Sequence, residues 1–127
     1  MKLLSASILA VALLAGCSSM STAPDTPTKT VDVVLIGPNG MTLYTFARDV
    51  PESGKSACND QCATNWPPLM APEAGKPMGG YSMLTRADGK KQWAYKGWPL
   101  YYWSKDAKAG DRTGEGMLNG AWKVARP

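Results

Sequence analysis

Two segments of the chain repeat each other, and this duplication limits the possible folds more than any other sequence feature. Gly40–Asp49 aligns with Gly97–Asp106 at an offset of 57 residues, with identical Gly, Leu, Tyr and Asp. After one deletion the match resumes at an offset of 56 residues, where Trp66 aligns with Trp122. A repeat of this length is normally one supersecondary unit that cannot bury its apolar face alone. We therefore expect the two copies to pack against each other.

Each copy has the pattern of a β-hairpin. In the first copy, a β-branched run over Val31–Ile36 leads through a turn at Gly37–Gly40 into a second strand over Met41–Ala47. The second copy repeats this order and adds one hairpin before it. The strands expected there are Tyr81–Arg86, Lys91–Tyr95, Pro99–Ser104 and a closing strand over Ala121–Ala125.

Only Ser56–Asn65 favours a helix, with Ser56 as its expected cap. The 13 Gly and 10 Pro among 127 residues indicate many turns, and the length suits one small domain. The sequence thus predicts a mostly β domain over residues 30–127. We expect it to contain two tandem β-hairpin-based repeats, about 31–70 and 81–125, and at most one short helix near 56–65.

Aromatic side chains gather on one face of each repeat. Residues two apart on a strand share a face, so Tyr44 lies beside Phe46 and Tyr101 lies beside Trp103. If the copies meet, these rings form one cluster, which Trp66 and Trp122 would join. We interpret the cluster as core. The alternative is an aromatic platform for a ligand.

An aspartate closes the strand in each copy. Asp49 and Asp106 are expected to accept N–H groups of the following turns, as Asp commonly does. Alternatively, face-to-face packing would bring the two carboxylates together as a cation site or an acid/base pair.

The N-terminus has the pattern of an export signal. Lys2 precedes Leu3–Leu14, an uncharged stretch that as a helix would reach about 18 Å, well short of a membrane span. Leu14–Cys17 (LAGC) looks like a bacterial lipobox, which predicts a signal peptide over 1–16 and acylation of Cys17. The alternative is an ordinary signal peptide. Acyl chains would hold the protein to a membrane.

Residues 17–29 read as a flexible Ser/Thr/Pro-rich tether that follows the lipidated cysteine. Ser18, in place of Asp, resembles the pattern of lipoproteins sorted to the outer membrane, if the host has two membranes. The expected location is therefore the cell envelope, facing the periplasm or the surface.

Lipidation of Cys17 leaves Cys58 and Cys62, which outside the cytoplasm favours a disulfide. We expect this disulfide to hold an irregular turn. The alternatives are a redox pair, half of a metal site, or two free thiols.

The composition argues against several classes of function. Histidine is absent, which removes Ser-His-Asp and Cys-His catalysis and the commonest metal ligand. The formal net charge is +4, and without Lys2 there remain 13 basic against 10 acidic residues, too few and too dispersed for a nucleic-acid surface. Gly110–Gly116 lacks the ending of a phosphate-binding loop. We expect no catalytic residue, cofactor, metal or nucleic-acid partner.

The chain resembles a bacterial family described as secreted repeats of unknown function, predicted lipoproteins with a Tyr-x-(Phe/Trp/Tyr)-x-x-Asp motif. The motif stands at Tyr44–Asp49 and Tyr101–Asp106. Gly54–Ser56, Cys58, Cys62, Trp66–Leu69 and Gly110–Asp111 also look like the family pattern. The resemblance covers residues 31–125 and implies no catalytic or binding residue.

Three functions fit these features. The favoured one is a non-enzymatic, membrane-anchored envelope module with an envelope protein as partner or a structural role. The second is a redox or copper-handling lipoprotein that uses Cys58 and Cys62 together with soft methionine ligands, which are Met41, Met70, Met78, Met83 and Met117. The third is a binder of a small ligand or glycan through the aromatic cluster, with Asp49 and Asp106 as polar contacts.

Overall fold

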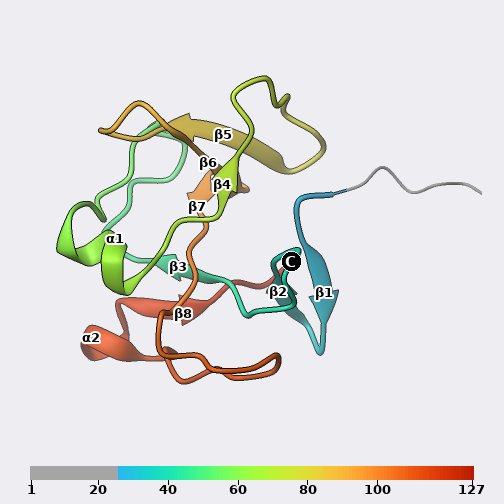
Figure 1. The fold of residues 1–127 in the computed structure, drawn as a ribbon, viewed down its shortest axis with the longest axis vertical. Coiled ribbons are helices and arrows are strands. Elements are labelled where there is room, and N and C mark those ends of the chain that lie inside the picture. Colours follow the sequence, from blue (N-terminus) through green and yellow to red (C-terminus); the bar gives the residue numbers. More distant parts are fainter. Residues whose placement is uncertain (1–25) are drawn as a thin grey trace, which may run out of the picture.

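A computed structural model describes residues 26–127, and it is built mostly of short antiparallel strands joined by turns (Figure 1). The elements are β1 (Lys29–Val31), β2 (Val34–Ile36), β3 (Tyr44–Phe46), α1 (Gln61–Asn65), β4 (Met70–Ala71), β5 (Tyr81–Thr85), β6 (Lys91–Tyr95), β7 (Trp98–Pro99), α2 (Met117–Gly120) and β8 (Trp122–Val124). The predicted mostly β class is confirmed.

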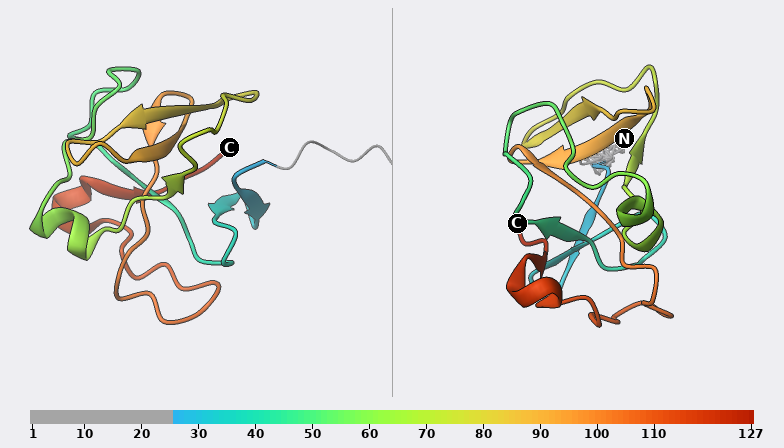
Figure 2. Two further views of the ribbon diagram at one scale, coloured as in Figure 1. Left: turned by 45° about the horizontal axis from the view of Figure 1, so that its top comes forward. Right: turned by 90° about the vertical axis from the view of Figure 1, so that its left-hand side faces the viewer.

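The strands form one larger sheet and two pairs. β4, β6 and β5 are neighbours in that order, and β7 also pairs with β6. β1 pairs with β2, and β3 pairs with β8. Figures 1 and 2 show these two pairs on one side of the molecule and the larger sheet on the other, with α1 and α2 toward one end.

Each repeat is completed by a strand from the other repeat. β8, at the end of the second copy, pairs with β3 of the first copy, with Tyr44 opposite Val124. β4, at the end of the first copy, pairs with β6 of the second copy, with Met70 opposite Gln92. The two closing segments are therefore exchanged, which is how two units that cannot bury their own apolar faces form one domain.

Two matching hydrogen-bond rings record this exchange. In the first, Leu35 N–H donates to Ala125 O, Ala125 N–H to Leu43 O, and Leu43 N–H to Leu35 O, over 2.8–3.0 Å. In the second, Trp93 donates to Leu69, Leu69 to Leu100, and Leu100 to Trp93, over 2.9–3.0 Å. The correspondence shows that the duplicated sequences adopt closely similar backbones.

The first expected strand is broken in two. β1 and β2 form a tight hairpin because Asp32 and Val33 both have positive φ, at 48° and 58°. Two successive residues in this region make the turn typical of two-residue hairpins. The prediction of one continuous strand over Val31–Ile36 is therefore wrong; a β-branched valine rarely takes this conformation, so the sequence pattern does not indicate the turn.

The helices differ from the prediction in start and number. α1 begins at Gln61, after Asp60, rather than at Ser56; the hydroxyl of Ser56 instead accepts the N–H of Cys58 over 3.1 Å. The structure also contains α2, a second short helix where at most one was expected. α2 follows α1 at the 56-residue offset, so the duplication accounts for it.

The folded region begins before residue 30. Thr28 is buried, and its hydroxyl contacts that of Tyr81. Residues 26–29 thus belong to the domain and not to the predicted tether. The predicted signal peptide (1–16), Cys17 and Ser18 lie outside the described residues. Within residues 26–127, no helix has both the length and the apolar character needed to cross a membrane.

Candidate functional site

The two motif tyrosines lie at the centre of the molecule, where the repeats meet. Tyr44 N–H donates to Tyr101 O over 2.7 Å, and Tyr101 N–H donates to Tyr44 O over 3.0 Å. Both residues are fully buried. This bridge pairs each tyrosine with its own counterpart, and so the interface is nearly symmetric.

Each motif tyrosine donates its hydroxyl to the motif aspartate of the other repeat. Tyr44 Oη lies 2.6 Å from Asp106 Oδ2, and Tyr101 Oη lies 2.8 Å from Asp49 Oδ2. The motif is therefore completed across the interface and not within one copy. Burial is the main cause that raises the pKa of both tyrosine hydroxyls, so both stay protonated and act as donors.

The second oxygen of each aspartate accepts from the turn that follows it. Asp49 Oδ1 accepts the N–H of Ala57 over 2.7 Å, and Asp106 Oδ1 accepts the N–H of Thr113 over 3.0 Å. The expected turn role is thus confirmed, with a tyrosine partner that sequence reasoning missed. The two carboxylates share no hydrogen-bond partner, because Asp49 bonds to Tyr101 and Ala57 whereas Asp106 bonds to Tyr44 and Thr113, so these bonds do not form the alternative cation site or acid/base pair. Among residues 26–127, no group of three or more His, Cys, Asp or Glu side chains could hold a metal.

Asp49 also has the positive charge of Arg86 near it. Burial raises the pKa of the Asp49 carboxyl, against the opposing effects of the Ala57 N–H, the Tyr101 hydroxyl and the positive charge of Arg86. Arg86 itself is only 6% exposed.

Arg86 is held by a small polar network. Its guanidinium donates to Gln92 Oε1 over 2.7 Å, to Cys58 O over 2.7 Å and to Ser56 Oγ over 3.1 Å. Gln92 in turn donates to Leu100 O over 2.8 Å. The network ties the longer hairpin β5–β6 to the loop that carries the disulfide, so its donors are used within the fold.

The aromatic cluster forms a stack of four rings. Trp66 and Trp122, the two counterparts, lie parallel with centroids 3.8 Å apart. Phe46 stacks on Trp122 and Trp103 stacks on Trp66, each at 4.1 Å. Tyr44 meets Trp66, and Tyr101 meets Trp122, edge to face. All six rings are buried, so they form core and offer no platform for a ligand.

Cys58 and Cys62 form the expected disulfide, with Cα atoms 5.2 Å apart. It joins an extended loop residue to α1, so it holds a loop against a helical turn. At the 56-residue offset the second copy has Gly114 and Leu118 and no such bond. The redox and copper hypotheses stay predictions.

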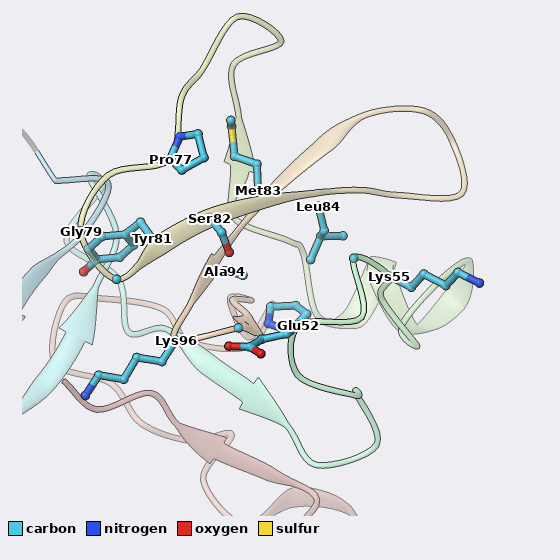
Figure 3. A pocket seen from close by; sticks show the side chains of 14 residues that line it. Glu52, Lys55, Pro77, Gly79, Tyr81, Ser82, Met83, Leu84, Ala94 and Lys96 are labelled. Carbon is cyan, nitrogen blue, oxygen red and sulfur yellow. The ribbon is translucent and has the colours of Figure 1, made fainter.

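Several surface hollows lie outside the motif. The one in Figure 3 has a volume of about 560 Å³ and lies between the loop at Glu52–Lys55 and strand β5. Figure 3 shows the side chains of Lys55 and Lys96 extending away from each other at its two ends. Four glycines, Gly54, Gly79, Gly80 and Gly97, supply bare backbone there. No cluster of side chains with a chemical role converges on it.

Comparison with known proteins gives one match. The model of a family described as "secreted repeat of unknown function" matches residues 29–70 and again residues 82–126. The two matched ranges coincide with the two copies found in the sequence. No match was found among curated proteins or among solved structures.

Proposed function

The chain belongs to the family of secreted repeats of unknown function, and we propose that it is a lipid-anchored module of the bacterial envelope. It acts by binding a partner or as a structural part, and not by catalysis. Cys17 carries the acyl chains, and the folded domain stands at the membrane surface, on the outer membrane if the host has two membranes.

One observation carries the non-enzymatic part of this proposal. The motif residues are those on which a shared chemistry would depend, yet Tyr44, Tyr101, Asp49 and Asp106 are buried and bonded to one another across the repeats. A general acid or base must reach the atom it serves. Groups enclosed in this way support a scaffold role for the motif, with function left to residues on the surface.

Two features support the anchored part. The Leu14–Cys17 ending follows an uncharged stretch of the length typical of export signals. The family description names a secreted protein, which agrees with a position outside the cytoplasm. Two or more acyl chains give stable membrane attachment without any spanning helix.

Metabolic labelling with a palmitate analogue tests the anchor. The wild-type chain should take up label and stay with the membrane fraction. Cys17→Ser should be unlabelled and released, whereas Ser19→Ala, the matched control, should behave as wild type. Label that persists in Cys17→Ser would overturn the proposal. Crosslinking in intact cells tests the binding role: a reproducible envelope protein supports it, and a blank contradicts it.

A further inference from the structure

A second hollow, with a volume of about 360 Å³, lies between β3, β7 and β8; we call it the β7–β8 hollow. Its floor is apolar and includes the buried residues Leu100 and Ala125, and Ala47, Tyr95 and Trp98 also line it. Trp98 is only partly buried, whereas the other four tryptophans are buried. The volume and the mainly apolar lining are typical of small-molecule sites.

The rim of the β7–β8 hollow carries positive charge only. Lys96, Lys123 and Arg126 line it and are exposed, and its lining contains no Asp or Glu. The Lys96 ammonium lies 5.3 Å from the centroid of the Tyr95 ring. Such a rim favours a ligand with a negative charge.

The other repeat shows what fills the equivalent space. Thr45, which lines the hollow, corresponds to Tyr102 of the second copy. Thr45 pairs with Lys123 of β8, and the N–H of Tyr102 donates to the carbonyl of Pro67, which is the counterpart of Lys123. Tyr102 is half-buried, and its ring lies directly over Gly37, where an added Cβ would come within 2.0 Å of the hydroxyl. The protein therefore fills one of the two equivalent sites with its own phenol ring.

At the β7–β8 hollow that ring is missing. Thr45 is too short to replace Tyr102, and Tyr95, which takes the place of Gly37, turns its ring onto Tyr81 (4.9 Å) and Gly80. The charges differ as well: Lys123 and Arg126 stand where the first copy has Pro67 and Met70. One site is thus closed and uncharged, and its counterpart is open with a basic rim.

We propose that the β7–β8 hollow binds a small anion that carries a planar ring, of the class of aromatic carboxylates. The ring lies on Trp98 and the apolar floor, in the region that Tyr102 fills in the other repeat, and the anionic group meets Lys123 and Arg126. This deepens the proposed function, on which it rests, because it gives the binding module a ligand class.

The test is an NMR titration of the isotope-labelled chain after removal of residues 1–16, with Cys17→Ser so that no anchor or detergent is needed. The probe is 2-naphthoate, and its uncharged amide is the comparison. A ligand of this size should bind with a dissociation constant of about 1 mM. Naphthoate should shift the Trp98 indole signal saturably and leave the four buried indoles in place. An equal response to the amide, or no saturable shift, would overturn the proposal.

Two pairs of variants locate the site. Ala47→Phe fills the hollow from an exposed position and should remove the shift, whereas Ser104→Phe, at the equivalent position of the other repeat, should not. Lys123→Gln with Arg126→Gln should weaken binding by about tenfold. Lys90→Gln with Lys108→Gln removes two exposed charges elsewhere and should leave it unchanged. The assignment is wrong if Ser104→Phe removes the shift as Ala47→Phe does. It is also wrong if the Lys90 and Lys108 double variant weakens binding as much as the double variant in the hollow. The titrated chain carries no anchor. A negative titration would therefore overturn the ligand site and leave the result of the palmitate labelling unaffected.

Discussion

Asp49 is a carboxylate enclosed by its own loop and by the other repeat, and this makes its effect on stability depend on pH. Burial raises its pKa from the ordinary value of 3.8, so the folded protein holds the proton more tightly than the unfolded chain does. Its contribution to stability is therefore complete below pH 3.8 and is lost as the pH rises through the raised folded pKa.

Asp49→Asn should lose this dependence, because the amide cannot ionise. The measurement is urea unfolding of wild type and variant between about pH 3 and about pH 7. The free energy of unfolding of wild type minus that of the variant should fall as the pH rises. A difference that grows with pH would show that ionised Asp49 is the favoured form in the fold.

The crossed tyrosine hydroxyls give a second prediction at this scale. Tyr44→Phe and Tyr101→Phe should each lower the free energy of unfolding by about 1–3 kcal/mol, because each leaves a buried carboxylate oxygen without its donor. Tyr95→Phe, at a half-buried ring, is the control and should cost less. Chemical denaturation measures all three. Equal losses in the three variants would contradict the assigned role of the crossed bonds.

At the scale of the elements, the loops before α1 and α2 pack against the aromatic core with different residues. Cys58 packs in the aromatic core and is bonded to Cys62, whereas its counterpart Gly114 lies against Trp66 and Trp103. A Cβ at Gly114 would come within 2.7 Å of Trp66 and 3.0 Å of Trp103. Only the first loop has room for a side chain at this position.

Gly114→Ala should therefore destabilise the fold by about 1–3 kcal/mol through overpacking. The matched variant, Cys58→Ala with Cys62→Ala, keeps a Cβ that already fits and loses the cross-link together with the packing of the two sulfur atoms. For a closed loop of five residues the loss of the cross-link is about 2 kcal/mol. Near-ultraviolet circular dichroism should show the stacked indoles intact in the cysteine variant and altered in Gly114→Ala. An unaltered spectrum and stability in Gly114→Ala would contradict the close contact.

The elements also show where sequence reasoning succeeds. The hairpin β5–β6 was predictable because Ala87–Lys90 is a strong turn between two β-forming runs. The core role of Tyr44, Phe46, Tyr101 and Trp103 followed from strand alternation. The motif itself was visible as a duplication, and so was the position of each aspartate at the end of a strand.

Other elements depend on interactions that a linear pattern does not contain. The break at Asp32 and Val33 needs two residues at positive φ, one of them β-branched. α2 contains Leu118 and Asn119 in left-handed conformations, so no helical periodicity reveals it, although the repeat of α1 does. The exchange of β4 and β8 and the buried Arg86 network arise only from tertiary packing. Alignment of the two copies could have revealed the Tyr102–Thr45 difference.

For the whole molecule, the exchanged closing strands make the two repeats depend on each other. Residues 26–75 and 76–127, expressed separately, should each lack the near-ultraviolet signal of the stacked indoles, since Trp66 and Trp122 then have no partner. Mixing the two fragments should restore the signal. Trp66→Ala in the first fragment is the control and should prevent recovery. A full signal from either fragment alone would contradict the exchange.

The pairing of β8 with β3, about 80 residues apart in the sequence, has a consequence for how the chain folds as it is made. The first repeat needs residues 121–125 to close its hydrogen-bond ring, so its fold is incomplete until these residues have been synthesised. A nascent chain that still lacks these residues cannot complete the first repeat. For a lipid-anchored protein of the kind proposed above, we therefore expect the chain to cross the membrane unfolded, and the domain to close only after residues 121–125 have crossed.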